Sequence, residues 1–436
     1  MVSPNDLAAC LRVLAALAER PDDADLDAVR QAVDQAYRAD KKRRKVRRLE
    51  QRREHDRALL ATTARFREHL AIEAAPKDEP RLLRGERRCY VCKCAYRQVD
   101  ADYHMLCPEC AEENTRRRHA RCDLTGRRAI VTGGRIKIGF HTAVKLLRDG
   151  AEVLVTTRFP GDAGRRFAAL PDAAEWRDRL WVHGVDFLDL NGVLELVGAV
   201  RDRWDRFDIL VNNAAQTIQR PLDYHREVHA AESLPRPSGI AITGGSHRRA
   251  IASGQSLVEL FPVGERDETG EPLDLRPENS WTLRVGDVTP CEWLEAHVIN
   301  AFVPFLLTGE LRPLLAASPF PDRYVVQVSA MEGSFSRTRK TAKHPHTNMA
   351  KAGLNMLTRT VAADYEAEGI YMTSVDTGWV TDERPHPSKT VHREAGFRPP
   401  LDVIDGAARV YDPIVRGVGG QRLSGVFLKD YRSVSW

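Results

Sequence analysis

The feature that most restricts the fold is a regular alternation of strand-like and helix-like segments across residues 123–436. Short runs rich in β-branched and aromatic residues stand at 128–132, 152–157, 181–185, 209–211, 324–328, 371–375 and 425–428. Segments with helical patterns separate these runs, as the crossovers between parallel strands require. The alternation therefore predicts an α/β domain built on a doubly wound parallel sheet. Such sheets bind their ligands at the carboxyl ends of the strands.

A glycine-rich turn connects the first of these strands to the following helix. Its sequence is Thr132-Gly133-Gly134-Arg135-Ile136-Lys137-Ile138-Gly139, and a turn of this kind directs backbone N–H groups at a pyrophosphate. Arg158 ends the second strand, where an acidic residue would bind a free ribose 2′-hydroxyl and a cation favours a 2′-phosphate. Asp186 ends the third strand, where it can accept a hydrogen bond from an adenine amino group, and Asn213 follows the fourth. Together these positions predict a dinucleotide site.

In this order the motifs resemble the short-chain dehydrogenase/reductase family over roughly the last 310 residues. That family carries a TGxxxGxG turn, an NNAG segment after the fourth strand, and catalytic Asn, Ser, Tyr and Lys residues, the last two spaced as YxxxK. The resemblance implies a Rossmann-like fold, a small-molecule substrate, a homo-oligomer (dimer or tetramer), and NADP(H) as cofactor with NAD(H) as the alternative. The cofactor-binding residues that it implies are Thr132, Gly133, Gly134, Arg135, Lys137, Ile138, Gly139, Arg158, Asp186, Asn213, Ala214, Ala215, Lys351, Gly378 and Thr381.

The catalytic positions depart from the family pattern. Asn300 and Lys351 match the family's asparagine and lysine, but the residue four positions before Lys351 is Thr347 rather than tyrosine. The family's catalytic serine position is Ala330, which leaves Ser329 and Ser334 as the nearest hydroxyls. The resemblance thus implies an altered active site in which Asn300 orders water, Lys351 binds ribose, and Thr347 and Ser329 offer hydrogen bonds to the substrate.

Replacement of the tyrosine removes the family's proton donor. A phenol has a pKa of about 10, which a nearby ammonium brings toward neutrality, whereas an alkyl hydroxyl is a far weaker acid. We expect His346 to be the first substitute donor, with His344 and Tyr324 as alternatives. Three functions stay open: an NADP(H)-dependent oxidoreductase with a substituted proton relay, a non-redox enzyme such as an isomerase, lyase or cyclase, and a non-catalytic NADP(H)-binding sensor or scaffold.

Two further departures concern the turn and the chain length. Lys137 stands where the family turn has its second glycine. Its side chain either crowds the approach of the nucleotide or, as we expect, brings its ammonium to a phosphate oxygen. The segment between Asn212 and Asn300 is far longer than the family needs, with the excess at about 222–284. We expect this insertion to emerge beside the substrate side of the sheet as a lid or an oligomer contact.

A cysteine cluster precedes the α/β region. The pairs Cys89-x2-Cys92 and Cys107-x2-Cys110 can form two knuckles that close a tetrahedron around Zn²⁺. A closed four-sulfur site leaves no position for substrate, so we predict a structural, zinc-ribbon-like module at 79–122 that needs its metal to fold. Clustered cysteines of this kind are typical of a reducing compartment, and we expect a cytoplasmic protein.

Residues 1–78 are predicted to be helical and basic. Leucines at positions 7, 11, 14 and 17 predict a helix that packs by one face. Lys and Arg fill positions 41–45 and recur to position 53, which indicates a solvated helix or, together with the zinc ribbon, a surface for nucleic acid or a protein partner. The whole chain is not a polycation, since its formal net charge is +5. No apolar run approaches the length of about 18 residues that a membrane-spanning helix needs.

Overall fold

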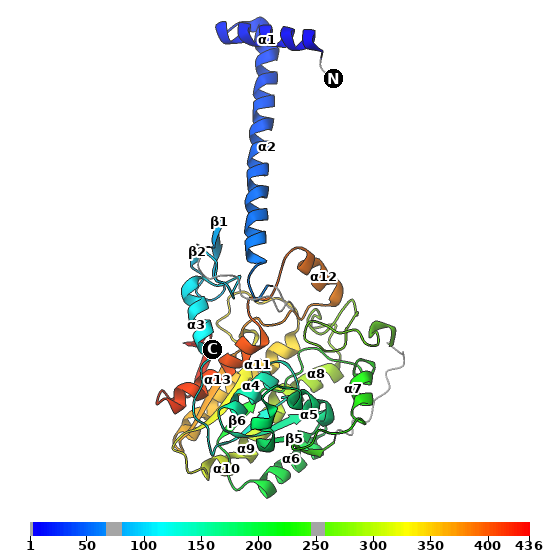
Figure 1. Cartoon of the computed structure of the whole chain (residues 1–436), viewed down its shortest axis with the longest axis vertical. Coiled ribbons are helices and arrows are strands. Elements are labelled where there is room, and N and C mark those ends of the chain that lie inside the picture. The colour runs from blue at the N-terminus through cyan, green and yellow to red at the C-terminus, as the bar shows by residue number, and fades with distance from the viewer. Residues whose placement is uncertain (1–2, 67–80, 246–257) are drawn as a thin grey trace.

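The structure is a computed structural model that describes residues 3–66, 81–245 and 258–436. Its body is built on a nine-stranded sheet in the order β11-β10-β9-β8-β6-β3-β4-β5-β7 (Figure 1). All the predicted strands are present, as β3 (Arg128–Thr132), β4 (Glu152–Thr157), β5 (Leu180–Gly184), β6 (Ile209–Asn212), β8 (Arg323–Ser329), β9 (Ile370–Asp376) and β10 (Val426–Lys429). β7 (Ala241–Gly244) and β11 (Arg432–Val434) extend the two edges.

The strand order reverses direction at the centre of the sheet. The chain runs from β3 through β4 to β5 on one side and returns to β6 at the centre. It then crosses back to add β7 beside β5, and finally continues through β8 and β9 to β10 on the other side. These strands and β7 all pair in parallel, and β11 pairs antiparallel with β10. The reversal between β3 and β6 is the switch point at which doubly wound sheets bind ligands. The predicted Rossmann-like α/β class is therefore confirmed.

Two apolar cores lie on the two faces of the sheet. Alternate residues of a strand point to opposite faces, so Val131 and Val153 enter one core while Ile130 and Leu154 enter the other. The first core is covered by α4 (Lys137–Arg148), α5 (Pro160–Ala168) and α13 (Val403–Val418). The second is covered by α6 (Leu190–Arg203), α9 (Val303–Glu310), α10 (Arg312–Ala316) and α11 (Pro345–Glu366). Burial on both faces explains why these strands are continuous apolar runs in the sequence.

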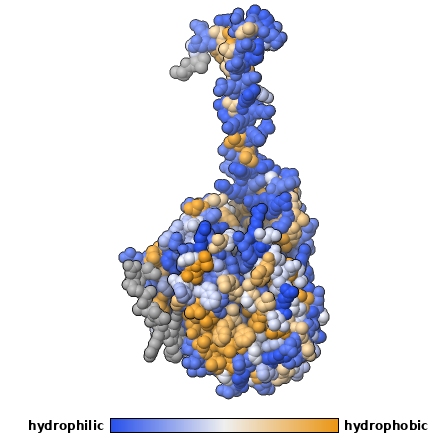
Figure 2. All heavy atoms as spheres, turned by 180° about the vertical axis from the view of Figure 1, so that it is seen from behind, coloured by the Kyte–Doolittle hydropathy of each residue, from blue (hydrophilic) through white to orange (hydrophobic). Residues whose placement is uncertain are grey.

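The N-terminal region forms a stalk. Helix α1 (Pro4–Glu19) lies across the tip of α2 (Asp27–Leu60), after the short turn η1 (Ala24–Leu26), and α2 projects far from the body (Figure 1). The expected burial of one face of α1 is wrong: none of its residues is buried, and Leu7 and Leu11 remain 55% and 58% exposed. The tip of a single helix is too narrow to cover the leucine stripe. The stalk is predominantly hydrophilic, whereas apolar side chains gather on the lower part of the body (Figure 2).

The cysteine-rich module lies at the base of the stalk. It consists of a hairpin of β1 (Leu82–Arg88) and β2 (Ala95–Gln98), followed by α3 (Pro108–Arg118). Helix α3 packs against α13 of the body, where Arg117 pairs with Asp412 at 2.6 Å and Arg118 with Asp402 at 2.6 Å. The predicted module boundary at residues 78 and 79 lies outside the described residues.

The insertion adds a strand to one edge of the sheet and contributes residues to the wall of the cleft. Its described part forms η4 (Leu222–His225), α7 (Arg226–Ala231), β7 and η5 (Val258–Leu260), while residues 246–257 lie outside the description. β7 pairs with β5 at the edge remote from β8 and β9, and Thr243 on it accepts a hydrogen bond from the Trp181 indole at 2.6 Å. The insertion therefore begins beside the β5 end of the cleft, because a free parallel edge was available there.

The remaining described elements are short turns and helices between those already named. These are the turns η2 (Ala173–Glu175), η3 (Arg177–Arg179) and η7 (Met331–Gly333), the helices α8 (Pro290–His297) and α12 (His386–Glu394), and the π-helical turn η6 (Val298–Phe302). Within the described ranges, no helix combines the length and the apolar character that crossing a membrane requires.

Candidate functional site

A cavity of about 1150 Å³ opens at the carboxyl ends of the central strands. The glycine turn, the loops after β4, β5, β6, β8 and β9, part of the insertion and the tip of the cysteine module form its wall. Thr132, Gly134 and His346 do not border it. The other predicted site residues do: Gly133, Arg135, Lys137, Ile138, Gly139, Arg158, Asp186, Asn213, Ala214, Ala215, Asn300, Ser329, Thr347, Lys351, Gly378 and Thr381.

The glycines of the turn occupy positions where no side chain fits. Gly133 has φ +67°, and a Cβ there would lie 2.8 Å from Ala214 Cα. A Cβ on Gly139 would lie 2.4 Å from Asn213 Nδ2, and one on Gly134 would lie 2.6 Å from Val155 Cγ1. The backbone of the turn is therefore packed closely onto β6 and β4, and it borders the cavity without intervening side chains. A turn of this kind can accept a phosphate group.

Thr132 supports the cavity from behind. Its hydroxyl accepts hydrogen bonds from the backbone N–H groups of Asn213 and Ala214, both at 3.0 Å. The Asn213 side chain donates in return to the carbonyl oxygens of Thr132 at 3.0 Å and Gly133 at 3.2 Å. Thr132 thus ties the glycine turn to the loop after β6, rather than reaching a ligand itself.

The end of the cavity near β4 and β5 combines an acid and a cation. Asp186 is buried, and its Oδ2 has no hydrogen-bond partner among the described residues. A buried carboxylate oxygen without a partner is costly, which points to a ligand that donates a hydrogen bond here. Arg158 lies at this end with its guanidinium 3.3 Å from His225 Nε2. Burial and the adjacent Arg158 hold the pKa of His225 well below its ordinary value, so Arg158 carries the positive charge of the pair.

The opposite end contains Lys351 and two hydroxyls. Lys351 Nζ donates to the Val328 carbonyl at 2.7 Å, and burial lowers its pKa to about 8. Ser329 follows Val328, and its buried hydroxyl has no partner within the described chain. Thr347 differs, because its hydroxyl already donates to the His344 carbonyl at 2.9 Å. Ser329 is therefore the hydroxyl placed to bind a ligand, while the Thr347 proton is engaged.

Asn300 lies in the π-helical turn η6 and is 1% exposed. Its Oδ1 accepts a hydrogen bond from Gln216 N at 2.6 Å, and its Nδ2 donates to Gln216 O at 3.0 Å. Single π-helical turns are frequent at functional sites, because the extra residue redirects side chains. Here the turn directs Asn300 at the loop after β6 and fixes that loop at the cavity wall.

The structure argues against His346 as the proton donor. The residue is 1% exposed, borders no part of the cavity, and its Nε2 lies 3.4 Å from Glu292 Oε1 on α8. Successive residues of an α-helix are rotated by about 100°, so His346 cannot share the direction of Thr347. Tyr324 is also excluded by position, because it begins β8 at the far end of the strand and donates to Asp322.

His344 does border the cavity, yet its ring is engaged. It stacks on Trp281 at 4.1 Å, and its Nδ1 lies 3.0 Å from Asn348 Oδ1. Burial lowers its pKa below the ordinary value. The lowered pKa disfavours the imidazolium form that a general acid would need, so His344 is better described as part of the cavity wall.

Lys137 and Arg135 contact acidic groups. Lys137 has φ +53°, the conformation that explains the usual glycine, and its Nζ lies 3.7 Å from Glu383 Oε1. Burial would raise the pKa of Glu383, but Lys137 and the hydroxyl of Thr381 hold it at about 2. Arg135 is 6% exposed and paired with Glu271 and, at 2.8 Å, with Asp162. The expected contact of Lys137 with a phosphate stays a prediction. Arg135 links Glu271 and Asp162 through its ion pairs and so holds this part of the cavity wall together.

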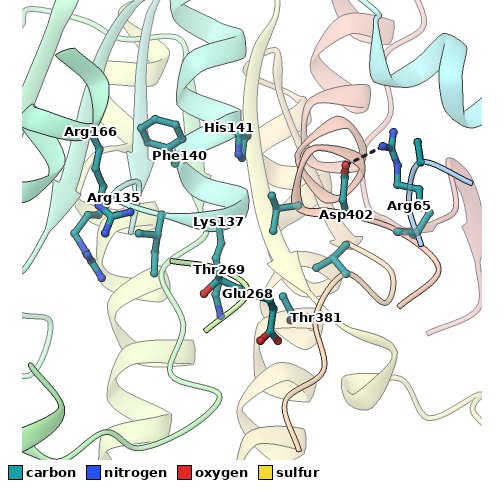
Figure 3. Close-up of a pocket in the computed structure, with 15 residues that line it drawn as sticks. Arg65, Arg135, Lys137, Phe140, His141, Arg166, Glu268, Thr269, Thr381 and Asp402 are labelled. Atoms are coloured by element: carbon teal, nitrogen blue, oxygen red, sulfur yellow. Dashed lines mark ion pairs between the residues drawn. The ribbon is translucent and has the colours of Figure 1, made fainter. Parts of the chain in front are cut away.

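A second cavity of about 380 Å³ lies behind the glycine turn (Figure 3). Lys137 and Thr381 border both cavities, so the two residues form part of the wall between them. On its far side Arg65, from the end of the stalk, points toward Asp402 at the start of α13, with 3.4 Å between their charged atoms. The stalk base therefore forms part of the wall of the second cavity.

The four predicted metal ligands converge at one point. The sulfur atoms of Cys89, Cys92, Cys107 and Cys110 all lie within 4.8 Å of one another. Cys92 Sγ and Cys107 Sγ are 3.6 Å apart, close to the separation of about 3.8 Å that a tetrahedral zinc–thiolate site gives. The arrangement can therefore hold a metal ion. His104 lies outside it, packed edge-on against Phe66.

Some residues of the cavity wall were missed by sequence reasoning. Tyr90, from the cysteine module, borders the cavity, as do Glu383, Glu271 and His225. The position of Tyr90 between two ligand cysteines marks it as the tip of a knuckle, but not as a neighbour of the cleft. The insertion that supplies His225 and Glu271 carries no motif, and Glu383 gave no signal.

Comparison with known proteins gives one family match and several relatives. The sequence model of short chain dehydrogenases matches residues 127–233. An uncharacterized protein of Acanthamoeba polyphaga mimivirus is 34% identical over 343 residues, covering 75% of this chain and 71% of that protein. A short chain dehydrogenase/reductase of Colletotrichum higginsianum is 37% identical over 99 residues, covering 21% of this chain and 23% of that protein. Among solved structures, the NADPH-bound carbonyl reductase from chicken fatty liver is 18% identical with a TM-score of 0.46, covering 72% of this chain and 100% of that chain.

Proposed function

This chain belongs to the short-chain dehydrogenase/reductase family, and on that premise we propose that it is an NADP(H)-dependent oxidoreductase acting on a carbonyl or hydroxyl group of a small molecule. The observation that carries the proposal is the pairing of two features in one cavity. The turn between β3 and α4 has three glycines at which a Cβ would not fit, and buried oxygens of Asp186 and Ser329 lack partners within the described chain. A dinucleotide would fill the cradle and supply the missing donor.

Each end of the cavity fits a part of the cofactor. Asp186 would accept a hydrogen bond from the adenine amino group, and Arg158 would pair with the 2′-phosphate that distinguishes NADP(H) from NAD(H). The backbone of the turn would donate to the pyrophosphate, and Lys351 would hold the second ribose. When bound, the nicotinamide supplies or accepts a hydride. Its reacting carbon would then face Ser329 and Thr347, which border the cavity.

The proton in this proposal comes from Lys351. Its pKa of about 8 lies near the operating range that a general acid needs. Its ammonium reaches the carbonyl of Val328, one residue from the unpartnered hydroxyl of Ser329. Ser329 would orient the substrate oxygen, Lys351 would give or take the proton, and Asn300 would hold the loop after β6 in place.

A non-redox function is the second candidate, and one observation favours it. The Thr347 hydroxyl is committed to a backbone carbonyl, and the family's serine position is Ala330. A chain that binds the nucleotide but lacks both family groups suits an isomerase, lyase or cyclase, or a sensor of the nucleotide. In that case the bound cofactor would keep its absorbance during turnover, or no turnover would occur.

Calorimetric titration with NADPH, and with NADH for comparison, tests the proposal first. Micromolar binding with NADPH preferred supports the cavity assignment, and absence of binding by both nucleotides refutes it. A panel of aldehydes and ketones is then screened for loss of NADPH absorbance. Lys351→Ala is the matched variant for chemistry, and Lys42→Ala on the exposed stalk is the control. Binding without oxidation of NADPH by any carbonyl compound would favour the non-redox alternative.

We also propose that the cysteine cluster binds a structural Zn²⁺. All four thiolates face one another, and Cys107 and Cys110 stand at the first turn of α3, where the helix dipole stabilises negative sulfur. Because cysteines must stay reduced to bind zinc, this proposal is consistent with a reducing compartment such as the cytoplasm. Metal analysis of the purified protein, with one zinc expected per chain, checks the assignment.

A homo-oligomer is supported by an exposed apolar face. Large apolar side chains on α8, η6, α9 and α11, elements that contact one another, remain between 37% and 58% exposed: Trp293, Leu294, Phe302, Phe305, Met349 and Met356. Contiguous exposed apolar patches mark interaction sites in soluble proteins. We propose that a second copy of the chain covers this face. Sedimentation equilibrium should give a dimer or tetramer, and Phe305→Glu should shift it to monomer.

For the stalk we propose a polyanionic partner, with nucleic acid as the first candidate. The cations at 41–45 of α2 are all exposed, and phosphate contacts by such groups release counterions. Retention on a nucleic-acid column should fall steeply with added salt and should fall further when Lys41 to Lys45 are neutralised. If retention depends neither on added salt nor on the charges of Lys41 to Lys45, a protein partner would be the remaining possibility.

A further inference from the structure

The tip of the cysteine module forms part of the wall of the nucleotide cavity. Tyr90 and Lys93 lie in the knuckle that carries Cys89 and Cys92, and both border the cavity. The knuckle is tightly held: Cys89 N donates to Cys94 O at 2.9 Å, and Tyr90 N donates to Met105 O at 2.8 Å. Metal ligation on both sides of Tyr90 would therefore fix where its ring lies.

The Tyr90 hydroxyl contacts the loop that follows β9. It accepts a hydrogen bond from the backbone N–H of Trp379 at 3.0 Å. Gly378, just before, has φ +77°, and a Cβ there would lie 2.6 Å from Leu401 and 3.6 Å from the Tyr90 hydroxyl. The backbone at 378–379 is thus enclosed between the knuckle on one side and Leu401 on the other. This loop begins the cover segment, defined here as residues 377–402, from the end of β9 to the start of α13.

From Trp379 a chain of contacts reaches the glycine turn. The Trp379 indole donates to the Thr381 carbonyl at 3.0 Å, and the Thr381 hydroxyl donates to Glu383 at 2.7 Å. Glu383 in turn lies 3.7 Å from the ammonium of Lys137. Tyr90 therefore anchors the first link of a series that ends at the predicted pyrophosphate cradle. Displacement of the Trp379 backbone would disturb each later contact.

The same module also holds the far end of the cover segment. His104 Nε2 lies 3.3 Å from the Arg398 carbonyl, and Leu401 joins the apolar cluster that contains the ligand cysteines. Arg118 on α3 pairs with Asp402 at 2.6 Å. Both ends of the segment are thus fixed by one small module, whereas a connection between β9 and α13 needs no such support for the sheet itself.

We propose that Tyr90 is a positioning residue for the nucleotide cavity, and that the cysteine module with its metal is a working part of that cavity. Tyr90 holds the Trp379 backbone, the cover segment keeps its shape, and Thr381 and Glu383 stay opposite the glycine turn. Affinity for NADP(H) then depends on whether the cysteine site is occupied by its metal, although that metal does not contact the nucleotide. The expected change in NADP(H) affinity rests on the proposed function. The expected change in the cover segment is independent of that function.

Two tyrosines of the same module give a matched pair of variants. Tyr90→Phe removes the acceptor of the Trp379 N–H and keeps the ring. Tyr96→Phe removes a more deeply buried hydrogen bond of the same module, from the Tyr96 hydroxyl to the His104 carbonyl at 3.1 Å, and Tyr96 does not border the cavity. Hydrogen exchange of peptides covering 377–385, NADPH titration and zinc content are measured on both variants and on the wild type.

Tyr90→Phe is expected to exchange faster at 377–385 and to bind NADPH about five-fold more weakly, the effect of one net hydrogen bond. Tyr96→Phe should match the wild type in both, and all three proteins should retain zinc. Unchanged exchange in Tyr90→Phe, or equal loss in both variants, would overturn the inference. Failure of wild-type protein to bind NADPH would refute the proposed function instead, and the exchange comparison would still decide the role of Tyr90.

Removal of zinc from the wild type provides a second measurement should Tyr90→Phe fold poorly. After chelation, exchange at 377–385 should rise while peptides from β8 and β9, which are central to the sheet, keep their protection. Unaltered protection of the cover segment after zinc loss would contradict the inference. Faster exchange confined to the cysteine module itself would contradict it equally.

Discussion

Replacing Lys351 by methionine should make the protein more stable at neutral pH while removing its activity. Burial lowers the pKa of Lys351 from 10.5 to about 8. The pKa of Lys351 thus differs by about 2.5 units between the unfolded and the folded chain, which corresponds to a free-energy cost of about 3 kcal/mol for keeping the charged form in the folded state. Below the folded pKa the ammonium is protonated in both states, so the folded state carries this whole cost. Methionine keeps the alkyl chain and removes the charge.

The expected net gain is smaller than that cost. Lys351 borders the cavity, where solvent reaches it, and its hydrogen bond to Val328 stabilises the folded state by about 1–2 kcal/mol. We therefore expect Lys351→Met to be about 1 kcal/mol more stable near pH 7. As pH rises from the folded pKa of about 8 to the unfolded value, the wild type is relieved of its penalty and the advantage of the variant is lost.

Urea denaturation of wild type, Lys351→Met and Lys42→Met at about pH 7, 8.5 and 10 measures this difference. Groups that titrate elsewhere cancel when each variant is subtracted from the wild type. The Lys351→Met difference should fall by about 2 kcal/mol across the range, while the Lys42→Met difference, for an exposed stalk residue, stays flat. A flat difference for Lys351→Met would show that its ammonium is not buried as described, and the proposed proton donor would fall with it.

Three other changes probe the same molecule. Thr347→Tyr restores the family's phenol beside Lys351 and should raise any carbonyl-dependent NADPH oxidation by about 100-fold or more; no gain would mean that the substrate is not a carbonyl at this position. Arg158→Glu should weaken NADPH binding at least ten-fold and leave NADH binding nearly unchanged, and equal loss of both by calorimetry would contradict the assigned 2′-phosphate site. Cys92→Ser, which removes one of the four converging sulfurs, should lower zinc content and the unfolding temperature together, and full zinc retention would exclude Cys92 as a ligand.

The fold and much of the cavity were predictable because their signals are local. Strands such as β3 and β4 are buried on both faces, so their apolar runs are unbroken, and the glycines of the turn are dictated by backbone contacts within a few residues. The short strand β7 has no buried residue, so it left no such run. The charged stretch at 41–48 has no periodic pattern of apolar residues that would predict a helix. In the structure it lies within helix α2, which passes through it without a break.

Other features depend on direction or on distant contacts. Thr347 and Lys351 are four residues apart and share a helix face, so the rotation of His346 away from them could have been inferred from helix geometry alone. The contact of Tyr90 with Trp379 joins residues 289 positions apart. No sequence pattern in either segment predicts that the two lie together. The pairing of Lys137 with Glu383 is equally invisible, because it depends on how the cover segment folds back.

The stalk has a consequence for how the size of this protein is measured. Helix α2 contains 34 residues and at 1.5 Å per residue extends about 50 Å, comparable to the width of the body that carries it. Such a projection adds friction out of proportion to its mass, so the Stokes radius of a single chain will resemble that of a larger sphere. A monomer would then elute from a sizing column where a compact dimer is expected, and only a shape-independent mass would tell the two apart.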